Sequence, residues 1–332
     1  MVTSRPRVFV SRTLPGPALE QLAQHAEVRV WEDAEPPTAQ QLQQAVADAD
    51  GLLCMLTDAI DQKLLAQAPH LHVISSCSVG VDHVDIVALN QRGIPLGHTP
   101  HVLVDATADL CFALMLAAAR RLPEAEQFLR GGEWTPARRW EPELLLGKDL
   151  RGATLGLLGL GAIGQAVAQR AQGFGMRVIG WTPSGRAVAG VESCEFEQVL
   201  AEADFLSLHL ALSERTRHII NAEALKRLRR DAILINTARG PLIDEAALVE
   251  ALQAGRLHTA ALDVFEAEPI GPQHPLLQAG RVIAVPHIGS ATRGTREQMA
   301  LRAVDNLLAG LAGRRMPYCA NPVVYAGQGA LA

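Results

Sequence analysis

The sequence of 332 residues lacks the features that mark membrane proteins, disulfide-bonded secreted proteins and nucleic-acid-binding proteins. Its longest apolar run, 110–119, is too short to span a bilayer, and its first residues lack the apolar region of a secretory signal. The five cysteines include no pair with the spacing of metal ligands or of a redox centre, so we expect reduced thiols and no metal. A net charge of −5 argues against nucleic acid as a partner. We therefore expect a cytoplasmic protein with neither a membrane nor a nucleic acid among its partners.

Repeats and low-complexity tracts are also absent, and short apolar runs alternate with amphipathic stretches along most of the chain. The length and the hydrophobic content of 48% favour about two globular domains. Alternating strands and helices predict α/β units with parallel sheets. A long apolar helix is expected before Arg121, and an amphipathic helix from about Ala291 to Leu311. The expected strands of a first unit are 7–10, 27–31, 51–56 and 71–75, and those of a second are 154–158, 177–181, 204–208, 232–236, 258–262 and 282–285.

A glycine-rich turn, Gly159-Leu-Gly-Ala-Ile-Gly164, stands between an expected strand and an expected helix. In a dinucleotide-binding turn the first glycine allows the tight turn, the second lets the backbone approach a pyrophosphate, and the third lets the helix pack closely on the sheet. A purely structural turn is the alternative, but the order of strand, turn, helix and strand favours a nucleotide site. The residues expected to bind the cofactor here are Gly159, Gly161, Ala162, Ile163 and Gly164.

Three ionisable residues, Arg239, Glu268 and His287, follow the last three expected strands. The carboxyl ends of parallel strands lie at one edge of a sheet, where ligands bind. Each residue alone has an ordinary explanation, as a surface arginine, an exposed carboxylate or a strand-end histidine. Together they suit hydride transfer, because a histidine can protonate a carbonyl oxygen, a carboxylate can keep the histidine charged, and an arginine can bind an oxyanion. Gly289 and Ser290 add hydrogen-bond donors close by.

The loop after the fourth strand, Ser76-Cys-Ser-Val-Gly-Val-Asp82, is a candidate anion-binding turn because it too follows the carboxyl end of a strand. A plain connection made of small residues is the alternative, and the residues alone leave it open. The loop is therefore a second candidate ligand-binding turn beside the glycine-rich one.

Several longer motifs occur in a fixed order: the glycine-rich turn, Ile235-Asn-Thr-Ala-Arg-Gly-Pro241, Ala261-Leu-Asp-Val-Phe-Glu-Ala-Glu-Pro269 and Pro286-His-Ile-Gly-Ser-Ala-Thr292. Through them the sequence resembles the D-isomer-specific 2-hydroxyacid dehydrogenase family over nearly its whole length. Within the family it is most similar to the glyoxylate and hydroxypyruvate reductases, through the additional stretches 78–83, 121–125 and 306–311.

The resemblance implies reduction of a small 2-oxo acid, glyoxylate or hydroxypyruvate, to glycolate or D-glycerate. It implies that Arg239 binds the substrate, that His287 is the general acid and base, and that Glu268 orients and charges His287. The groups implied to receive the substrate carboxylate are the backbone at Val79 and Gly80, helped by Ser290. The residues implied to line the nicotinamide cofactor are Asp263, which would hold the carboxamide, with Thr107, Ala211, Thr237, Ala238 and Gly289.

The choice of cofactor is predicted from the end of the second strand of the nucleotide-binding sheet. Many members of the family carry an acidic residue there that binds the ribose hydroxyls, but this sequence has Thr182. Ser184 and Arg186 follow, and a guanidinium suits a 2′-phosphate. We therefore expect NADP(H) to be preferred and NAD(H) to be possible. A second departure is Ala211, where the family pattern His-x-Pro has proline.

The resemblance further implies two Rossmann-like or flavodoxin-like domains with the active site in the cleft between them. Residues 1–101 with 288–332 would form a discontinuous substrate-binding domain, and 102–287 the nucleotide-binding Rossmann domain. A homodimer is expected, with the irregular arm 134–147 reaching the neighbouring subunit.

Other activities on this fold are alternatives. Another D-2-hydroxyacid dehydrogenase is one, and phosphite oxidation is another, although relatives with that activity carry lysine where Val79 stands. Phosphoglycerate and formate dehydrogenases are expected to have a regulatory domain or an extended N-terminus that these 332 residues do not include. A corepressor-like module that senses NAD(H) without catalysis is the alternative from another class.

Overall fold

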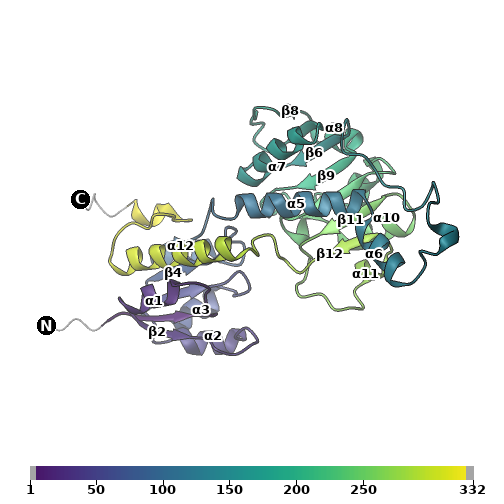
Figure 1. Cartoon of the computed structure of the whole chain (residues 1–332). Coiled ribbons are helices and arrows are strands. Elements are labelled where there is room, and N and C mark those ends of the chain that lie inside the picture. Colours follow the sequence, from purple (N-terminus) through teal and green to yellow (C-terminus); the bar gives the residue numbers. More distant parts are fainter. Residues whose placement is uncertain (1–4, 327–332) are drawn as a thin grey trace. The chain divides into compact units, whose positions relative to one another are not determined.

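The computed structural model describes residues 5–326, which form two compact units (Figure 1). The first unit combines the chain up to Leu103 with the chain from Ala291 onward, and the second comprises Val104–Ser290. The division falls a few residues after the boundaries predicted from the sequence. No helix among residues 5–326 is both long and apolar enough to cross a membrane.

The first unit is built on a five-stranded parallel sheet with the order β2-β1-β3-β4-β5. This order is that of flavodoxin-like folds. All residues of β3 and β4 are buried, which explains why the two strands are continuous apolar or small-residue runs. The strands are β1 (Arg7–Val10), β2 (Glu27–Val30), β3 (Gly51–Cys54), β4 (Val73–Ser76) and β5 (Leu96–Gly97).

Helices cover both faces of this sheet. Helices α2, α3 and α4 contribute to the core on one face, and α1 and α12 contribute to the core on the other. The longest of them, α12, begins after Thr292, whose hydroxyl caps it by accepting a hydrogen bond from the N–H of Thr295. The helices are α1 (Ala18–Ala23), α2 (Ala39–Val46), α3 (Gln62–Gln67), α4 (Ile86–Arg92) and α12 (Arg293–Leu311), with a 3-10 turn η3 (Pro322–Tyr325).

The second unit has a seven-stranded parallel sheet with the order β12-β11-β10-β9-β6-β7-β8. The chain runs outward from β6 to β8, then returns to β9 and continues to β12 on the other side. The order therefore reverses between β6 and β9, which is where doubly wound sheets bind nucleotides. The strands are β6 (Thr154–Leu158), β7 (Arg177–Trp181), β8 (Glu192–Ser193), β9 (Phe205–Leu208), β10 (Ile233–Asn236), β11 (Thr259–Leu262) and β12 (Val282–Ala284).

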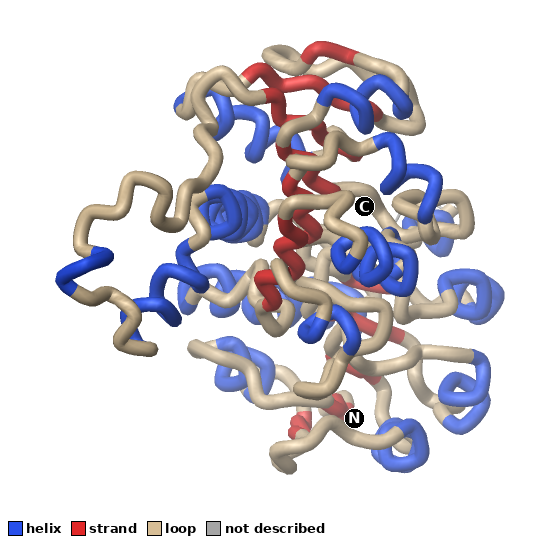
Figure 2. Tube along the Cα trace, turned by 90° about the vertical axis from the view of Figure 1, so that its right-hand side faces the viewer, coloured by secondary structure: helices blue, strands red, loops and turns tan. Residues whose placement is uncertain are grey.

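Two apolar cores enclose the seven-stranded sheet. Helices α5 and α7 share the core on one face, and α8 to α11 share the core on the other. Because α5 packs against both the sheet and α7, it is apolar nearly all round. Figure 2 shows the strands as a layer between helices. The helices are α5 (Val104–Ala119), α6 (Leu122–Arg130), α7 (Ala162–Gly173), α8 (Phe196–Glu202), α9 (Ala222–Arg227), α10 (Glu245–Gln253) and α11 (Pro275–Gln278), with 3-10 turns η1 (Pro136–Arg138) and η2 (Gly240–Leu242).

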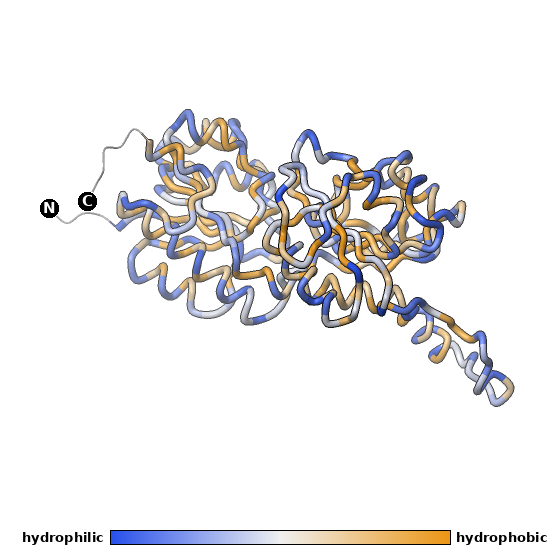
Figure 3. Tube along the Cα trace, turned by 90° about the horizontal axis from the view of Figure 1, so that it is seen from above, coloured by the Kyte–Doolittle hydropathy of each residue, from blue (hydrophilic) through white to orange (hydrophobic). Residues whose placement is uncertain are grey.

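An arm made of α6 and residues 131–147 projects from the second unit (Figure 3). Helix α6 buries none of its residues, and beyond η1 the arm has no regular structure. Several large apolar side chains of the arm are exposed, and that of Trp140 is 92% exposed. Apolar surface of this kind usually marks an interface.

The predicted fold class, two α/β units with parallel sheets, is confirmed. The predicted strands are all present, with ends that shift by up to two residues. The strands β5 and β8 and the helices α4 and α6 were not predicted. Strands β5 and β8 have only two residues each, and β8 is exposed. Neither strand therefore has an apolar run long enough to indicate a strand in the sequence.

Candidate active site

The glycine-rich turn joins β6 to α7, and its three glycines occupy different surroundings. Gly159 has φ +101°, and a Cβ there would lie 2.5 Å from the carbonyl oxygen of His209. A Cβ on Gly164 would lie 2.2 Å from the carbonyl oxygen of Gly159, so α7 can pack this closely only on a glycine. A Cβ on Gly161 would meet no atom within 4 Å. The first and third glycines are therefore needed by the fold, and the second leaves open space at the N-terminus of α7.

The end of β7 presents the side chains from which the cofactor preference was predicted. Thr182 follows the strand, and its carbonyl oxygen accepts a hydrogen bond from the N–H of Gly185 at 3.0 Å, which closes a tight turn. The side chains of Ser184 and Arg186 are exposed on this turn. No carboxylate lies between 182 and 186, so the turn carries positive charge only.

Other residues predicted to line the cofactor lie in the second unit. Thr107, near the start of α5, donates its hydroxyl to the carbonyl oxygen of Gly289 at 3.1 Å. The carbonyl oxygen of Ala211 accepts the hydroxyl of Thr216 at 2.7 Å. The hydroxyl of Thr237 is buried and has no hydrogen-bond partner within residues 5–326. A buried polar atom without a protein partner is normally satisfied by a ligand or water, so the hydroxyl of Thr237 fits a bound nicotinamide cofactor.

Arg239 follows β10 in a turn that Asn236 holds. The side-chain amide of Asn236 donates to the carbonyl oxygen of Arg239 at 2.8 Å, and its oxygen accepts the N–H of Ala238 at 3.0 Å. The next residue, Gly240, packs so closely that a Cβ on it would lie 1.8 Å from the carbonyl carbon of Phe265. The loop that carries Arg239 is therefore packed directly on the loop that leads to Glu268.

His287 and Glu268 form a hydrogen-bonded pair, with 2.7 Å between Nδ1 and Oε2. The other carboxylate oxygen of Glu268 accepts the N–H of Phe265 at 2.9 Å. Burial tends to raise the pKa of Glu268, but these hydrogen bonds and the charges of His287 and Arg239 outweigh it and lower the pKa. The carboxylate is therefore ionised at neutral pH. An ionised carboxylate can only accept a hydrogen bond, so Nδ1 of His287 keeps its proton and Nε2 is left to exchange a proton with a substrate.

Asp263, at the end of β11, holds the loop that carries His287. Its two carboxylate oxygens accept the N–H groups of Ile288 at 2.6 Å and Gly289 at 2.8 Å, and its carbonyl oxygen accepts the N–H of His287 at 2.9 Å. Burial raises the pKa of Asp263, against the effect of these hydrogen bonds and of the charge on His287. The contacts fix His287 with a φ of +51°, a conformation that is uncommon for residues other than glycine.

The predicted site residues therefore fall into two groups. Arg239, Glu268 and His287 follow the neighbouring strands β10, β11 and β12, and the charge of Arg239 acts on Glu268. The half-buried Ser290 ends the same unit. Val79 and Gly80 lie in the first unit, in the loop after β4. Sequence reasoning missed the roles of Asn236 and of the Asp263 carboxylate in shaping these loops. Their positions at strand ends were the available signal.

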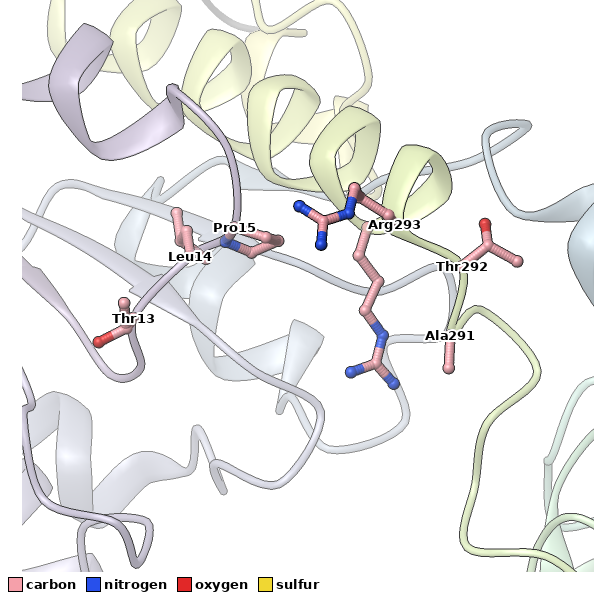
Figure 4. A pocket seen from close by; sticks show the side chains of 7 residues that line it. Thr13, Leu14, Pro15, Ala291, Thr292 and Arg293 are labelled. Atoms are coloured by element: carbon pink, nitrogen blue, oxygen red, sulfur yellow. The ribbon is translucent and has the colours of Figure 1, made fainter.

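A pocket of about 380 Å³ in the first unit contains none of the predicted site residues. It lies between the loop after β1 and the start of α12 (Figure 4). No group of His, Cys, Asp or Glu side chains in the described part of the chain could hold a metal ion. The pocket is lined by Thr13, Leu14, Pro15, Ala291, Thr292, Arg293 and Arg296.

Comparisons with known proteins show what this chain is similar to. Residues 112–289 match the model of the D-isomer specific 2-hydroxyacid dehydrogenase NAD-binding domain. A glyoxylate reductase from Aeropyrum pernix is 45% identical over 96% of this chain and 96% of its own. A structure from Thermus thermophilus superposes with a TM-score of 0.89 at 48% identity, covering 95% and 99% of the two chains. An NADPH-dependent glyoxylate/hydroxypyruvate reductase from Sinorhizobium meliloti, in complex with NADP and malonate, superposes with a TM-score of 0.84 at 34% identity, covering 95% and 97%.

Proposed function

The chain belongs to the D-isomer specific 2-hydroxyacid dehydrogenase family, and on that premise we propose that it reduces glyoxylate and hydroxypyruvate to glycolate and D-glycerate. The observation that carries this proposal is the hydrogen-bonded pair of His287 and Glu268 beside Arg239, at the ends of three adjacent strands. This set supplies a proton donor, a group that keeps the donor charged and a fixed cation.

Each of the three side chains has a separate task in the reduction. Arg239 binds the 2-oxo acid through charge-assisted hydrogen bonds and orients its carbonyl group. His287 donates the proton on Nε2 to the carbonyl oxygen as that oxygen becomes a hydroxyl, and its imidazole becomes neutral. Glu268 holds Nδ1 throughout and stabilises the imidazolium before transfer. The nicotinamide cofactor, when bound, supplies the hydride to the carbonyl carbon.

We propose that the cofactor is held by the turn at Gly159–Gly164, with its pyrophosphate at the N-terminus of α7. The open space at Gly161 and the unsatisfied hydroxyl of Thr237 support this assignment. We propose a preference for NADP(H), which rests on the exposed Arg186 and on the absence of a carboxylate after β7. Asp263, Thr107, Ala211, Ala238 and Gly289 are proposed to line the nicotinamide end.

Small substrates are proposed because the carboxylate is assigned to backbone N–H groups at Val79 and Gly80, to Ser290 and to Arg239. A hydroxymethyl group next to the carbonyl can form a hydrogen bond that a methyl group cannot, so hydroxypyruvate should react faster than pyruvate. The test is oxidation of NADPH by the purified chain with glyoxylate, hydroxypyruvate, pyruvate and an aromatic 2-oxo acid. A higher kcat/KM for the aromatic acid would contradict the proposal.

We also propose a homodimer in which the arm of residues 122–147 is covered by the second subunit. The exposed apolar side chains of Leu129, Trp134 and Trp140 support this. Trp140→Ser should weaken the dimer, which light scattering would detect as a lower average molar mass. Val87→Ser, at an exposed apolar position of the first unit, is the control and should leave the molar mass unchanged. A wild-type chain that is monomeric at micromolar concentration would contradict this part. The cytoplasmic location remains a prediction from the sequence.

A further inference from the structure

We propose that His98 is a positioning residue that aims the N–H groups of Val79 and Gly80 at the carboxylate of the substrate. The inference rests on the proposed function, because it takes the loop after β4 as the place where the carboxylate of a 2-oxo acid binds. His98 itself follows β5, the strand beside β4 in the sheet of the first unit.

Two successive carbonyl groups of this loop are held by the segment after β5. The carbonyl oxygen of Ser78 accepts the N–H of Thr99 at 2.8 Å, and that of Val79 lies 3.1 Å from Nδ1 of His98. Because a carbonyl oxygen can only accept, Nδ1 of His98 carries the proton in this contact. Neighbouring donors on one segment therefore fix two consecutive peptide groups.

Fixing these carbonyl groups also fixes the two N–H groups. Both peptide bonds are trans, so each N–H points opposite to the carbonyl of its own peptide. The N–H groups of Val79 and Gly80 therefore both point away from His98 and Thr99. In an extended strand successive N–H groups alternate, whereas two on the same side form a concave anion site. Neither N–H has a hydrogen-bond acceptor within residues 5–326.

Hydrogen bonds hold the backbone of His98 on both sides, and this fixes the position from which its imidazole contacts the loop after β4. Its N–H donates to the carbonyl oxygen of Tyr318 at 3.1 Å, and its carbonyl oxygen accepts the side-chain amide of Asn306 at 2.8 Å. Asn306 is fully buried in α12, and its oxygen accepts the N–H of Tyr318 at 2.9 Å. The helix that completes the first unit thus anchors the residue that holds the loop.

The other end of the loop is held without His98. The hydroxyl of Ser78 donates to the carbonyl oxygen of Gly80 at 2.7 Å and contacts the hydroxyl of Ser76 at 2.7 Å. Oγ of Ser76 lies 3.1 Å from Nε2 of His83. These contacts and the bond from Thr99 remain when the imidazole is replaced, so the loop should keep its path while the peptide between Val79 and Gly80 is free to rotate.

The test compares His98→Phe, which keeps a ring but removes the donor, with His98→Asn, whose amide nitrogen is as far along the side chain as Nδ1. The Phe variant should raise the KM for glyoxylate about tenfold, the usual effect of one hydrogen bond to a charged group. Its kcat and its KM for NADPH should change by less than about threefold. In the Asn variant the KM for glyoxylate should return most of the way to the wild-type value. His25→Phe, at an exposed position of the same unit, is the control and should match wild type.

An unchanged KM for glyoxylate in the Phe variant would overturn the inference. A general loss of kcat and melting temperature that the Asn variant does not rescue would also overturn it, because it would indicate a structural role.

A binding experiment separates this inference from the proposed function. In ¹⁵N-labelled wild-type protein, oxalate should shift the NMR signals of the Val79 and Gly80 amides. The shifts should be smaller in the Phe variant. Shifts without turnover of any 2-oxo acid would refute the proposed function alone, and identical shifts in both proteins would refute the role of His98.

Discussion

Oε2 of Glu268 accepts a 2.7 Å hydrogen bond from Nδ1 of His287, although the two residues are nineteen positions apart in the sequence. The pair forms because β11 and β12 are neighbours in the sheet and both side chains follow their carboxyl ends. Since the pKa of Glu268 is lowered, the carboxylate stays charged through the neutral range and keeps the proton on Nδ1. All proton exchange with a substrate is thereby assigned to Nε2.

Removal of this imidazole should affect the chemical step more than the binding of the cofactor. We expect His287→Ala to lower kcat by roughly two to four orders of magnitude, the usual contribution of a positioned general acid. Glu268→Gln should lower kcat less, because the amide still contacts the imidazole but no longer stabilises its charge. Steady-state assays with hydroxypyruvate and fluorescence titration with NADPH measure the two effects separately. An unchanged kcat in the His287 variant would remove this residue from the mechanism.

The cofactor preference is tested at the turn after β7. Arg186→Ala should raise the KM for NADPH several-fold with little effect on NADH, because a guanidinium binds a 2′-phosphate through charge-assisted hydrogen bonds. Thr182→Asp should shift the preference toward NADH, because a carboxylate accepts the ribose hydroxyls and repels the phosphate. If the wild type has an equal or higher kcat/KM with NADH, the argument from Thr182 and Arg186 fails.

Two glycines of the same turn should respond differently to one added methyl group. Gly161→Ala should leave the melting temperature nearly unchanged and raise the KM for the cofactor, since its Cβ meets no protein atom within 4 Å but stands where the pyrophosphate is proposed. Gly164→Ala should lower the melting temperature, since its Cβ would lie 2.2 Å from a backbone oxygen and α7 would have to shift. Thermal melts and cofactor titrations of both variants check this. A stable Gly164 variant, or a Gly161 variant with normal cofactor affinity, would contradict it.

Stability should fall in mild acid because of His209. Burial lowers the pKa of this histidine from 6.5 to about 4, so between these pH values the unfolded chain binds a proton that the folded chain does not. The free energy of unfolding should therefore decrease as the pH falls from about 6.5 to about 4, by up to about 3 kcal/mol. His209→Gln cannot titrate and should show a flatter pH dependence in urea unfolding between pH 7 and pH 4.5. If the free energy of unfolding depends on pH in the same way in wild type and variant, His209 does not cause the loss of stability in acid.

The sequence predicted the sheet of each unit well because buried parallel strands are continuous apolar runs, as in β9 and β10. The same reasoning placed Arg239, Glu268 and His287 in the loops after β10, β11 and β12, at the edge where parallel sheets bind ligands. It could not predict elements without such a run. Helix α6, which buries no residue, is the clearest example.

The contacts that hold the site in shape were not predictable from the sequence. The bonds from Ile288 and Gly289 to Asp263 join residues twenty-five and twenty-six positions apart, and their geometry depends on how β11 and β12 pair. The left-handed conformation of His287 likewise follows from these tertiary bonds and not from its own preference. A motif specifies which side chains are present, whereas the packing of neighbouring loops decides where each one points.

Helix α12 gives the chain an unusual order of assembly during synthesis on the ribosome. It supplies Ala300, Ala303, Val304 and Leu307 to one face of the five-stranded sheet, yet it is translated after the whole of Val104–Ser290. The unit whose first residues are synthesised first therefore completes its core last. In most nascent chains the N-terminal domain is instead the first to fold. Until α12 has been made, β3 and β4 keep one apolar face uncovered, while the second unit already has every strand and helix it needs to fold.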